Sequence, residues 1–265
     1  MWLRTSCEFS FNIIEATPFI LMLRPRSNAK QWVAREEYRI SPNIPVYEFT
    51  DLYENLCQRL VAPPGHFSIK TTADVRTSEE NKNGYNAPFI EIQELPDSVI
   101  KYLMPSRYCE SDRFNQMAMD ITYGETPGYN QVAKIESWLK QNISYIPGSS
   151  NYPVSATEVN QKQSGVCRDL AHLGISLCRS ISIPARMVVG YLHHLEPMDM
   201  HAWFEAYVGG KWYSFDAVRT TTAMDGYVSV GYGRDAADVA VYTQFGFPVY
   251  PLTQKVSVEE IDPVT

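Results

Sequence analysis

Two glycines in tandem, Gly209 and Gly210, separate the stretches "HAWFEAYV" and "KWYSFDAV". A Gly-Gly pair between two runs of strand-forming residues predicts a tight β-hairpin, because glycine readily adopts the positive φ angles of such turns. This feature constrains the fold more than any other in the chain, since it fixes which residues of the two strands are neighbours. If Val208 pairs with Lys211, both strands belong to one antiparallel sheet.

The register of this hairpin brings a histidine and an aspartate onto one face of the sheet. Trp203 then lies opposite Asp216, and His201 and Asp216 become diagonal neighbours, roughly 7–8 Å apart at the backbone. At that distance a carboxylate can bond to an imidazole nitrogen and orient the ring, whereas a three-residue loop would turn one partner to the opposite face. We therefore expect a His201–Asp216 pair, with Trp203 as a cleft wall that shields the imidazole from water.

A cysteine, Cys167, opens a helical pattern earlier in the chain. The stretch "SGVCRDLAHLG" and the residues after it carry apolar side chains at helical spacing, which predicts a helix from about Gly165 to Arg179. In the first turn of a helix the unpaired N–H groups and the dipole favour an anion, and the thiolate is the reactive form of cysteine. The stretch alone leaves two interpretations, a buried core residue or a nucleophile that requires a base.

Composition sets the class of protein. With 265 residues, 45% of them hydrophobic and 20% charged, the chain is globular and forms one large domain or two modest ones. A net charge of −7 without a basic run argues against nucleic acid and anionic membranes as partners. No apolar run approaches the ~20 residues of a membrane span, and the N-terminus lacks an apolar signal-peptide core, so we expect a cytoplasmic protein. An odd number of cysteines, 5, without C-x-x-C spacing predicts neither a disulfide framework nor a zinc knuckle.

The pattern along the chain changes character near residue 95. Before it, short runs rich in β-branched and aromatic residues are separated by Pro, Gly and Asn, which predicts an N-terminal β-sandwich domain over residues 1–95. After it, helical spacing dominates up to residue 180 and strand patterns follow, which is typical of an α+β domain over residues 96–265.

Three motifs occur in a fixed order: "GVCRDLAHL", "IPARMVVGY" and "HAWFEAYVGGKWYSFDA". With them the chain resembles the bacterial transglutaminase-like superfamily, in its cysteine-protease branch. The resemblance implies a papain-like catalytic domain with Cys167 as nucleophile, His201 as base and Asp216 as the residue that orients the base. The early stretches "LRPRSN" and "DLYEN" resemble the bacterial transglutaminase-like N-terminal β domain. One departure is that "AVR" follows Asp216, where the family usually has Pro or Thr and then Asn.

The resemblance implies acyl transfer through a thioester on the cysteine. We favour hydrolysis of a peptide or protein amide, as in a cysteine protease or amidase. Transfer to an amine, as in a protein-glutamine transglutaminase, is the alternative, and a non-catalytic module that binds a substrate or partner is an alternative of another class. We expect no cofactor, and no metal at the polar cluster near the base, because these residues lack a fixed ligand spacing: His193, His194, Asp199 and His201.

Such chemistry also needs donors for a developing oxyanion. The backbone N–H of Cys167 is the first expected donor. Candidates for the second are Gln161, which precedes the cysteine by a spacing that papain-like enzymes use, and Tyr145.

Other polar residues near the motifs are expected to be structural. Asp169 is placed to cap the helix that begins near Cys167, and Arg168 is expected to form an ion pair. The stretch "GRDAAD" is expected to form a turn in which Arg234 pairs with Asp235, Asp238 or another carboxylate.

Overall fold

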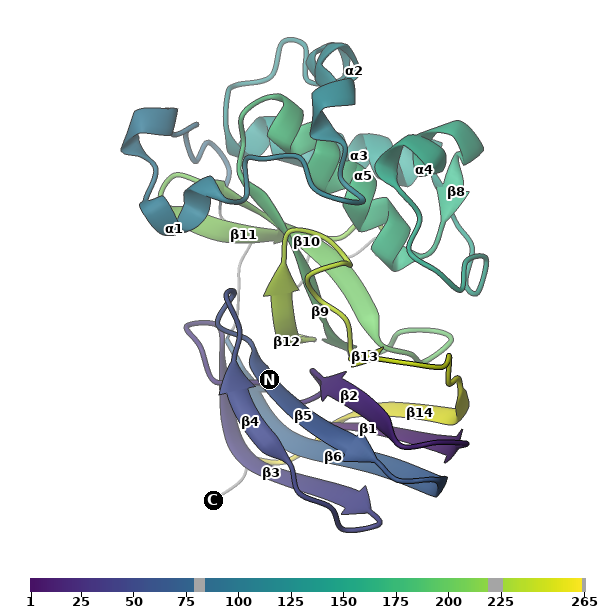
Figure 1. Cartoon of the computed structure of the whole chain (residues 1–265). Helices are drawn as coiled ribbons and strands as arrows, with labels where there is room; N and C mark the ends of the chain where they lie inside the picture. Colours follow the sequence, from purple (N-terminus) through teal and green to yellow (C-terminus); the bar gives the residue numbers. More distant parts are fainter. Residues whose placement is uncertain (79–83, 219–225, 264–265) are drawn as a thin grey trace.

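Strands from both ends of the chain combine into one β unit. The computed structural model describes residues 1–78, 84–218 and 226–263 (Figure 1). One four-stranded antiparallel sheet has the order β14-β1-β6-β3, and a second has the order β13-β2-β5-β4. The strands of the first sheet are β1 (Trp2–Ile13), β3 (Gln31–Ser41), β6 (Gly65–Thr77) and β14 (Pro251–Glu260). Those of the second are β2 (Thr17–Leu21), β4 (Tyr47–Thr50), β5 (Leu56–Ala62) and β13 (Tyr242–Gln244).

Aromatic side chains fill the space between these two sheets. Phe11 of β1 and Phe19 of β2 come from different sheets, and their ring centroids lie 5.3 Å apart. Phe19 also contacts Phe67 of β6, at 5.9 Å. All three rings are buried, because alternate residues of a strand point to the same side and here face the opposing sheet. The predicted N-terminal β region is present, as two packed sheets.

The predicted division into residues 1–95 and 96–265 does not describe the C-terminal end of the chain. Strand β14 pairs along β1, with Val258 opposite Thr5, and β13 pairs with β2. Residues 242–260 therefore belong to the β unit rather than to the second domain. A local hydrophobic pattern can indicate a strand but not a partner that lies more than two hundred residues away, so this pairing could not be predicted from the pattern.

The middle of the chain forms an α+β unit. Helices come first: α1 (Asp97–Ile100), α2 (Asn115–Ile121), α3 (Tyr129–Asn142), α4 (Ala156–Lys162) and α5 (Cys167–Ser180), with short 3₁₀ turns at Ile92–Glu94 and Ser111–Arg113. The two short strands β7 (Ser144–Tyr145) and β8 (Ser164–Gly165) pair between them. An antiparallel sheet of order β11-β10-β9-β12 follows, from β9 (Ala185–Leu192), β10 (His201–Val208), β11 (Lys211–Phe215) and β12 (Tyr227–Gly233). The fold is thus α+β as predicted, and among the described helices none is long and apolar enough to cross a membrane.

Helix α5 is fixed tightly against the sheet. A Cβ atom added at Gly174 would lie 2.7 Å from the ring of Phe204 on β10, so only glycine allows this approach. The apolar stripe predicted for this helix is fully buried, as Leu170, Leu173 and Leu177 show. Cys167 is the first residue of α5, and the packing of the helix therefore sets its position relative to β10.

The β unit covers the face of this sheet that lies opposite α5, and it also covers the edge formed by β12 (Figure 1). The side-chain amide of Gln31 accepts from the backbone N–H of Ser229 and donates to its carbonyl, both at 2.8 Å. Asn55 makes the same pair of bonds with Tyr232, at 2.8 and 2.7 Å. These two amides satisfy backbone groups of β12 that no strand pairs, which joins the two units and protects the sheet edge.

Candidate active site

The Gly-Gly hairpin has the predicted register. Gly209 and Gly210 have φ angles of +55° and +79°, which a two-residue turn of this kind requires. Val208 pairs with Lys211, and the pairing continues to Phe204 and Phe215. His201 at the start of β10 and Asp216 just after β11 therefore lie at the same end of the hairpin.

His201 and Asp216 form the predicted pair. Nε2 of His201 lies 2.8 Å from Oδ2 of Asp216, and both residues are buried. Burial alone would lower the pKa of His201, but the charge and hydrogen bond of Asp216, together with Cys167, raise it to about 10. The imidazole is therefore held in a position where it keeps a proton.

Asp216 is itself held by several donors. The hydroxyl of Tyr227 donates to Oδ2 at 2.5 Å, and the backbone N–H of Val218 donates to Oδ1 at 2.8 Å. Burial would raise the pKa of Asp216, yet His201 and these hydrogen bonds lower it to about 2. The backbone N–H of Asp216 donates to Glu136 of α3 at 3.0 Å, which ties the end of β11 to the helical layer. Asp216 thus remains a carboxylate with a fixed orientation.

The thiol of Cys167 differs from every other thiol of the chain. Cys7, Cys57, Cys109 and Cys178 are buried, whereas Cys167 is partly exposed. Burial raises the pKa of the Cys7 thiol to about 12 and that of Cys57 to about 11, which keeps them protonated. Cys167 is thus the cysteine that a substrate can reach.

The second nitrogen of the imidazole is the one available to this thiol. Nδ1 of His201 is buried, and among the described residues the thiol of Cys167 is the one group near enough to be its partner. Cys167 lies close enough to interact with the same ring. Both the charge of its sulfur and a hydrogen bond between the two residues raise the pKa of His201. The structure therefore brings Cys167, His201 and Asp216 together in the order thiol, imidazole, carboxylate.

The start of α5 is capped as the sequence predicts. The backbone N–H of Val166 donates to Oδ2 of Asp169 at 3.3 Å, and Ser150 donates to the same oxygen at 2.5 Å. Arg168 forms an ion pair with Asp169 at 2.9 Å and donates to the carbonyl of Tyr152 at 2.7 Å. These contacts fix the first turn of the helix, which places the backbone N–H of Cys167 at its positive end.

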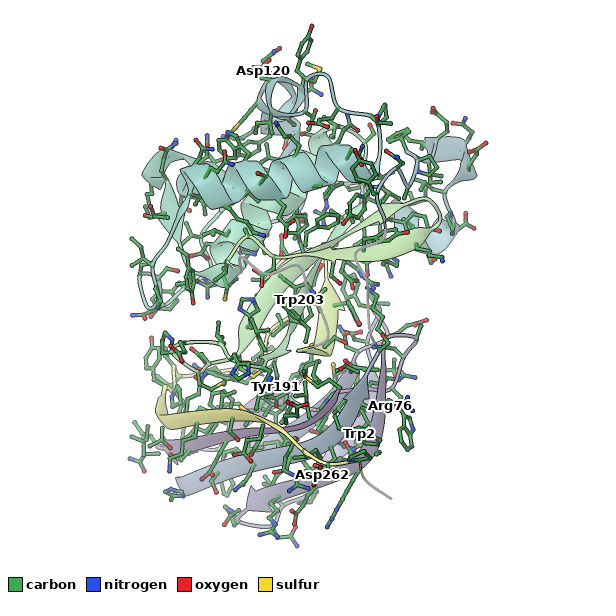
Figure 2. The ribbon with its side chains drawn as sticks, turned by 180° about the vertical axis from the view of Figure 1, so that it is seen from behind. Trp2, Arg76, Asp120, Tyr191, Trp203 and Asp262 are labelled. Atoms are coloured by element: carbon green, nitrogen blue, oxygen red, sulfur yellow. The ribbon has the colours of Figure 1, made fainter. Side chains whose placement is uncertain are left out.

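Trp203 forms a wall beside the imidazole. Its ring is 3% exposed and stacks on His201 with the centroids 6.1 Å apart. Tyr227 contacts the indole edge-on at 5.0 Å. Figure 2 shows Trp203 on the face of the sheet that looks towards the β unit. Water is thereby excluded from one side of the His201–Asp216 pair.

Comparison with known proteins places this site in a family. Residues 115–217 match the model of the transglutaminase-like superfamily, and residues 11–77 match the bacterial transglutaminase-like N-terminal region. The crystal structure of a candidate cysteine protease from Cytophaga hutchinsonii is 34% identical, has a TM-score of 0.91, and is matched over 100% of this chain and 92% of its own. The chain belongs to the transglutaminase-like superfamily.

Two mycobacterial proteins are also similar to this transglutaminase-like protein. An uncharacterised protein of Mycobacterium leprae is 29% identical over 231 residues, which span 82% of each chain. An uncharacterised protein of Mycobacterium tuberculosis is 29% identical over 143 residues, which span 49% of this chain and 46% of its own. These two relatives carry no information about the reaction.

The two candidates for a second oxyanion donor in the transglutaminase-like core are placed differently. Tyr145 of β7 pairs with Gly165, two residues before Cys167. Burial, followed by the charges of Cys167, Asp199 and Asp216, raises the pKa of Tyr145 to about 12, so its hydroxyl stays protonated and near the site. Gln161 is exposed on α4.

Sequence reasoning missed Tyr227 and Glu136, which position Asp216. Tyr227 lies on β12, and β12 pairs with β9 rather than with the hairpin. The stretch "GYVSVGYG" predicts the strand, but only the order of strands in the sheet places its first tyrosine beside the aspartate. Glu136 could have been noticed as a charge on the buried face of α3, where it is 8% exposed.

The residues after Asp216 depart from the family pattern. In place of the usual Pro or Thr, this chain has Ala217, which is 8% exposed. The backbone N–H of the next residue, Val218, bonds to the carboxylate, so this stretch still supports Asp216. Arg219, the third residue of the departure, lies outside the described residues.

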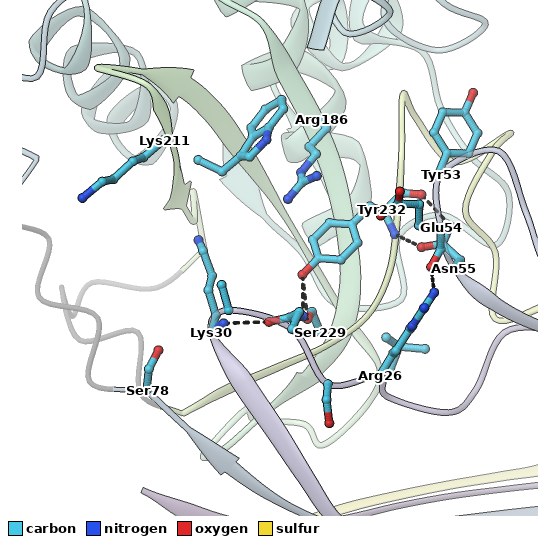
Figure 3. A pocket seen from close by; sticks show the side chains of 15 residues that line it. Arg26, Lys30, Tyr53, Glu54, Asn55, Ser78, Arg186, Lys211, Ser229 and Tyr232 are labelled. Atoms are coloured by element: carbon cyan, nitrogen blue, oxygen red, sulfur yellow. Dashed lines mark hydrogen bonds between the residues drawn. The ribbon is translucent and has the colours of Figure 1, made fainter. Parts of the chain in front are cut away.

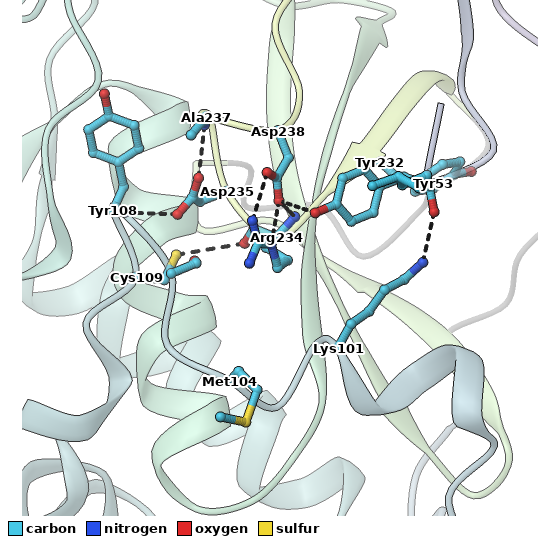
Figure 4. Close-up of polar contacts among 12 residues, drawn as sticks. Tyr53, Lys101, Met104, Tyr108, Cys109, Tyr232, Arg234, Asp235, Ala237 and Asp238 are labelled. Carbon is cyan, nitrogen blue, oxygen red and sulfur yellow. Dashed lines mark hydrogen bonds and ion pairs between the residues drawn. The ribbon is translucent and has the colours of Figure 1, made fainter. Parts of the chain in front are cut away.

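The stretch "GRDAAD" forms the expected structural turn (Figure 4). Arg234 binds Asp238 through two bonds, at 2.7 and 3.0 Å, and Tyr53 donates to the same carboxylate at 2.6 Å. Asp235 accepts from the backbone N–H of Tyr108 at 2.8 Å. The predicted pairing of Arg234 with a nearby aspartate is confirmed.

The polar cluster near the base is engaged in local contacts. The rings of His193 and His194 lie 3.8 Å apart. Asp199 accepts from the backbone N–H of Met200 at 2.7 Å and from the side chain of Gln254 on β14. Within the described residues, no group of three or more His, Cys, Asp or Glu side chains is arranged to hold a metal ion.

Proposed function

We propose that the protein is a thiol-dependent acyl-transfer enzyme that hydrolyses amide bonds of peptides or proteins. Cys167 is the nucleophile, His201 the base and Asp216 the group that orients the base. The observation that carries this proposal is the state of His201. Its Nε2 is held by Asp216 at 2.8 Å, while its Nδ1 is buried and has no partner among the described residues other than the nearby thiol.

The first half of the reaction forms a thioester. Cys167 and His201 begin as a thiolate–imidazolium pair in which the thiol proton lies on Nδ1, and the thiolate attacks the amide carbonyl carbon. The carbonyl oxygen becomes an oxyanion, to which the backbone N–H of Cys167 and the hydroxyl of Tyr145 donate hydrogen bonds. The intermediate collapses, the C–N bond breaks, and the amine leaves with the proton from His201.

The second half releases the acyl group. Neutral His201 removes a proton from a water molecule, and the hydroxide attacks the thioester carbonyl. The C–S bond breaks, the acid departs, and the proton stays on His201, which restores the thiolate–imidazolium pair. Asp216 remains ionised throughout, because its pKa of about 2 lies far below neutral pH. Its charge stabilises the imidazolium that forms in each half-reaction.

Water and amines can both accept the acyl group from such a thioester, and we propose water. The relative from Cytophaga hutchinsonii, with 34% identity, has the name of a candidate cysteine protease, which supports hydrolysis. Transfer to an amine uses the same three residues, so the choice is decided by product analysis.

Alkylation with iodoacetamide between pH 5 and 7 tests the reactive pair. Cys167 should react faster than Cys178 of the same helix, which is an internal control because it is buried. His201→Ala should slow the labelling of Cys167 and leave Cys178 unchanged. Equal reactivity of the two cysteines, unaffected by His201→Ala, would contradict the enzyme proposal and favour a binding module.

Incubation with a glutamine-containing peptide distinguishes the two acyl acceptors. The peptide is followed by mass spectrometry with and without a primary amine, and Cys167→Ala protein is the matched control. We expect gain of water at an amide bond in both samples. Incorporation of the amine without hydrolysis would overturn the proposal in favour of a transamidase.

A further inference from the structure

A cavity at the junction of the two units is not used by the proposed reaction. It encloses about 660 Å³, which lies within the range of small-molecule sites (Figure 3). The β unit contributes residues 26–30 and 53–55, and the sheet contributes Arg186, Trp212 and Tyr232. Cys167, His201 and Asp216 do not line it, so the cavity is separate from the candidate active site.

Positive charge dominates the lining of this cavity. Of the described residues that line it, Arg26, Lys30, Arg186 and Lys211 are cationic, and Glu54 is the one carboxylate. The whole chain, by contrast, carries a net charge of −7. A concave surface with cations on a low-dielectric wall concentrates anions from solution.

The floor of the cavity presents an immobilised guanidinium group. Arg186 donates to Glu205 from Nε at 2.8 Å and from Nη2 at 2.6 Å. Its guanidinium carbon lies 4.2 Å from the ring centroid of Trp212 and 4.1 Å from that of Tyr232. Figure 3 shows the group projecting into the cavity, so N–H groups that Glu205 does not occupy are already oriented towards a ligand.

Two further cations lie on opposite sides of the cavity (Figure 3). Arg26 donates to the backbone carbonyl of Glu54 at 2.8 Å, an acceptor without net charge. The side chain of Lys211 makes no hydrogen bond or ion pair with another described residue, although its backbone pairs with Val208. The fold therefore does not match either charge with a carboxylate, and both side chains are exposed and able to contact a ligand.

We propose that this cavity binds an anionic ligand that carries carboxylate or phosphate groups. Arg186 binds the anion at the floor through two N–H groups, and Arg26 and Lys211 contact it at the rim. The site extends the protein beyond its proposed acyl-transfer activity, because it acts through a different set of residues.

Calorimetric titration of the full chain with pyrophosphate and with citrate tests this site. We expect saturable binding of one molecule per chain that weakens as salt is added. The double variant R26Q/K211Q should bind at least about tenfold more weakly, since it loses two charge-assisted contacts. Stronger binding of pyrophosphate would identify a phosphate ligand, and stronger binding of citrate a carboxylate. Repeating the titration with Cys167→Ala protein makes the result independent of the proposed reaction.

The double variant R39Q/K255Q is the matched control. It removes the same charge from exposed positions on β3 and β14 that do not line the cavity. Its affinity should stay within about twofold of the unsubstituted chain, since these charges lie outside the site. Absence of saturable binding for both anions, or an equal loss in the two double variants, would overturn the proposal.

Discussion

Two buried carboxylates on one face of the sheet have similar surroundings but different partners. Asp216 accepts from His201, and Glu205 of β10 accepts from Arg186 and from Lys30 at 2.9 Å. In both cases burial alone would raise the pKa of the carboxylate, but nearby cations and their hydrogen bonds outweigh it and lower the pKa to about 2. Both carboxylates therefore stay ionised at neutral pH, and the difference between the two clusters lies in the cations.

One of the two clusters contains a cation that can give up its proton. Arg186 is always charged, and its position is fixed between two aromatic rings. His201 can lose a proton, and its buried Nδ1 has no partner among the described residues other than the nearby thiol of Cys167. The cluster whose cation can be deprotonated is therefore the one beside the partly exposed thiol of Cys167.

We expect substitution of Cys167 to change the rate of hydrolysis more than any other substitution, with little effect on the stability of the fold. Cys167→Ala should lower the rate of amide hydrolysis roughly 10⁴-fold or more, because the covalent route is lost. Its free energy of unfolding should change by less than about 1 kcal/mol, since the side chain is partly exposed. Cys178→Ala in the same helix is the control and should do the reverse, with a stability loss on the order of 1 kcal/mol and retained activity. Urea unfolding and peptide hydrolysis measure the two quantities.

The second prediction concerns the ion-pair cluster of Glu205 with Arg186 and Lys30. Glu205→Gln leaves the partly buried charge of Arg186 without its counter-charge, and we expect the free energy of unfolding to fall by about 3 kcal/mol. The exposed pair of Glu37 and Arg39 offers the control, because Glu37→Gln should cost less than about 0.5 kcal/mol. Equal stability of the two variants would mean that the Glu205 cluster does not hold the units together.

The third effect is a dependence of stability on pH. Asp216 and Glu205, with pKa values of about 2, contribute stability that is present above the ordinary carboxyl range and is lost as the pH falls towards 2. His201, with a pKa of about 10, contributes stability that is full below pH 6.5 and is lost as the pH rises through 10. Urea unfolding between pH 2 and 7 should show a loss on the order of 2 kcal/mol per carboxylate. An unchanged acid limb in Glu205→Gln would contradict the assignment to that residue.

Local patterns predicted the parts of the site that depend on neighbours in the chain. The turn at Gly209 and Gly210 fixes the register by itself, so the His201–Asp216 pair could be derived from spacing alone. The cap at Asp169 and the first turn of α5 follow from a few adjacent residues. The Cys167–His201 contact joins two elements, and the sequence supplied it only through the resemblance to a family.

Contacts that depend on strand order could not be derived in this way. The position of Tyr227 requires knowledge that β12 lies beside β9, and that of Gln254 requires the pairing of β14 with β1. The Arg186–Glu205 ion pair follows from the β9–β10 register, which no tight turn specifies. Long-range pairing is selected by the packing of the whole core, and a local period contains no information about it.

The smallest expected effect tests whether Tyr227 belongs to the reactive cluster or only to the packing. Tyr227→Phe removes the hydroxyl that donates to Asp216 and keeps the ring against Trp203. We expect kcat to fall about tenfold with KM unchanged, because one hydrogen bond to an ionised carboxylate contributes about 1.5–3 kcal/mol before the remaining donors compensate. Tyr232→Phe on the same strand is the control, since its hydroxyl donates to Ser229 rather than to Asp216. A parallel fall of kcat in both variants would assign the loss to the strand as a whole. A selective fall of kcat in Tyr227→Phe means that Asp216 needs the hydroxyl of Tyr227 to orient the imidazole.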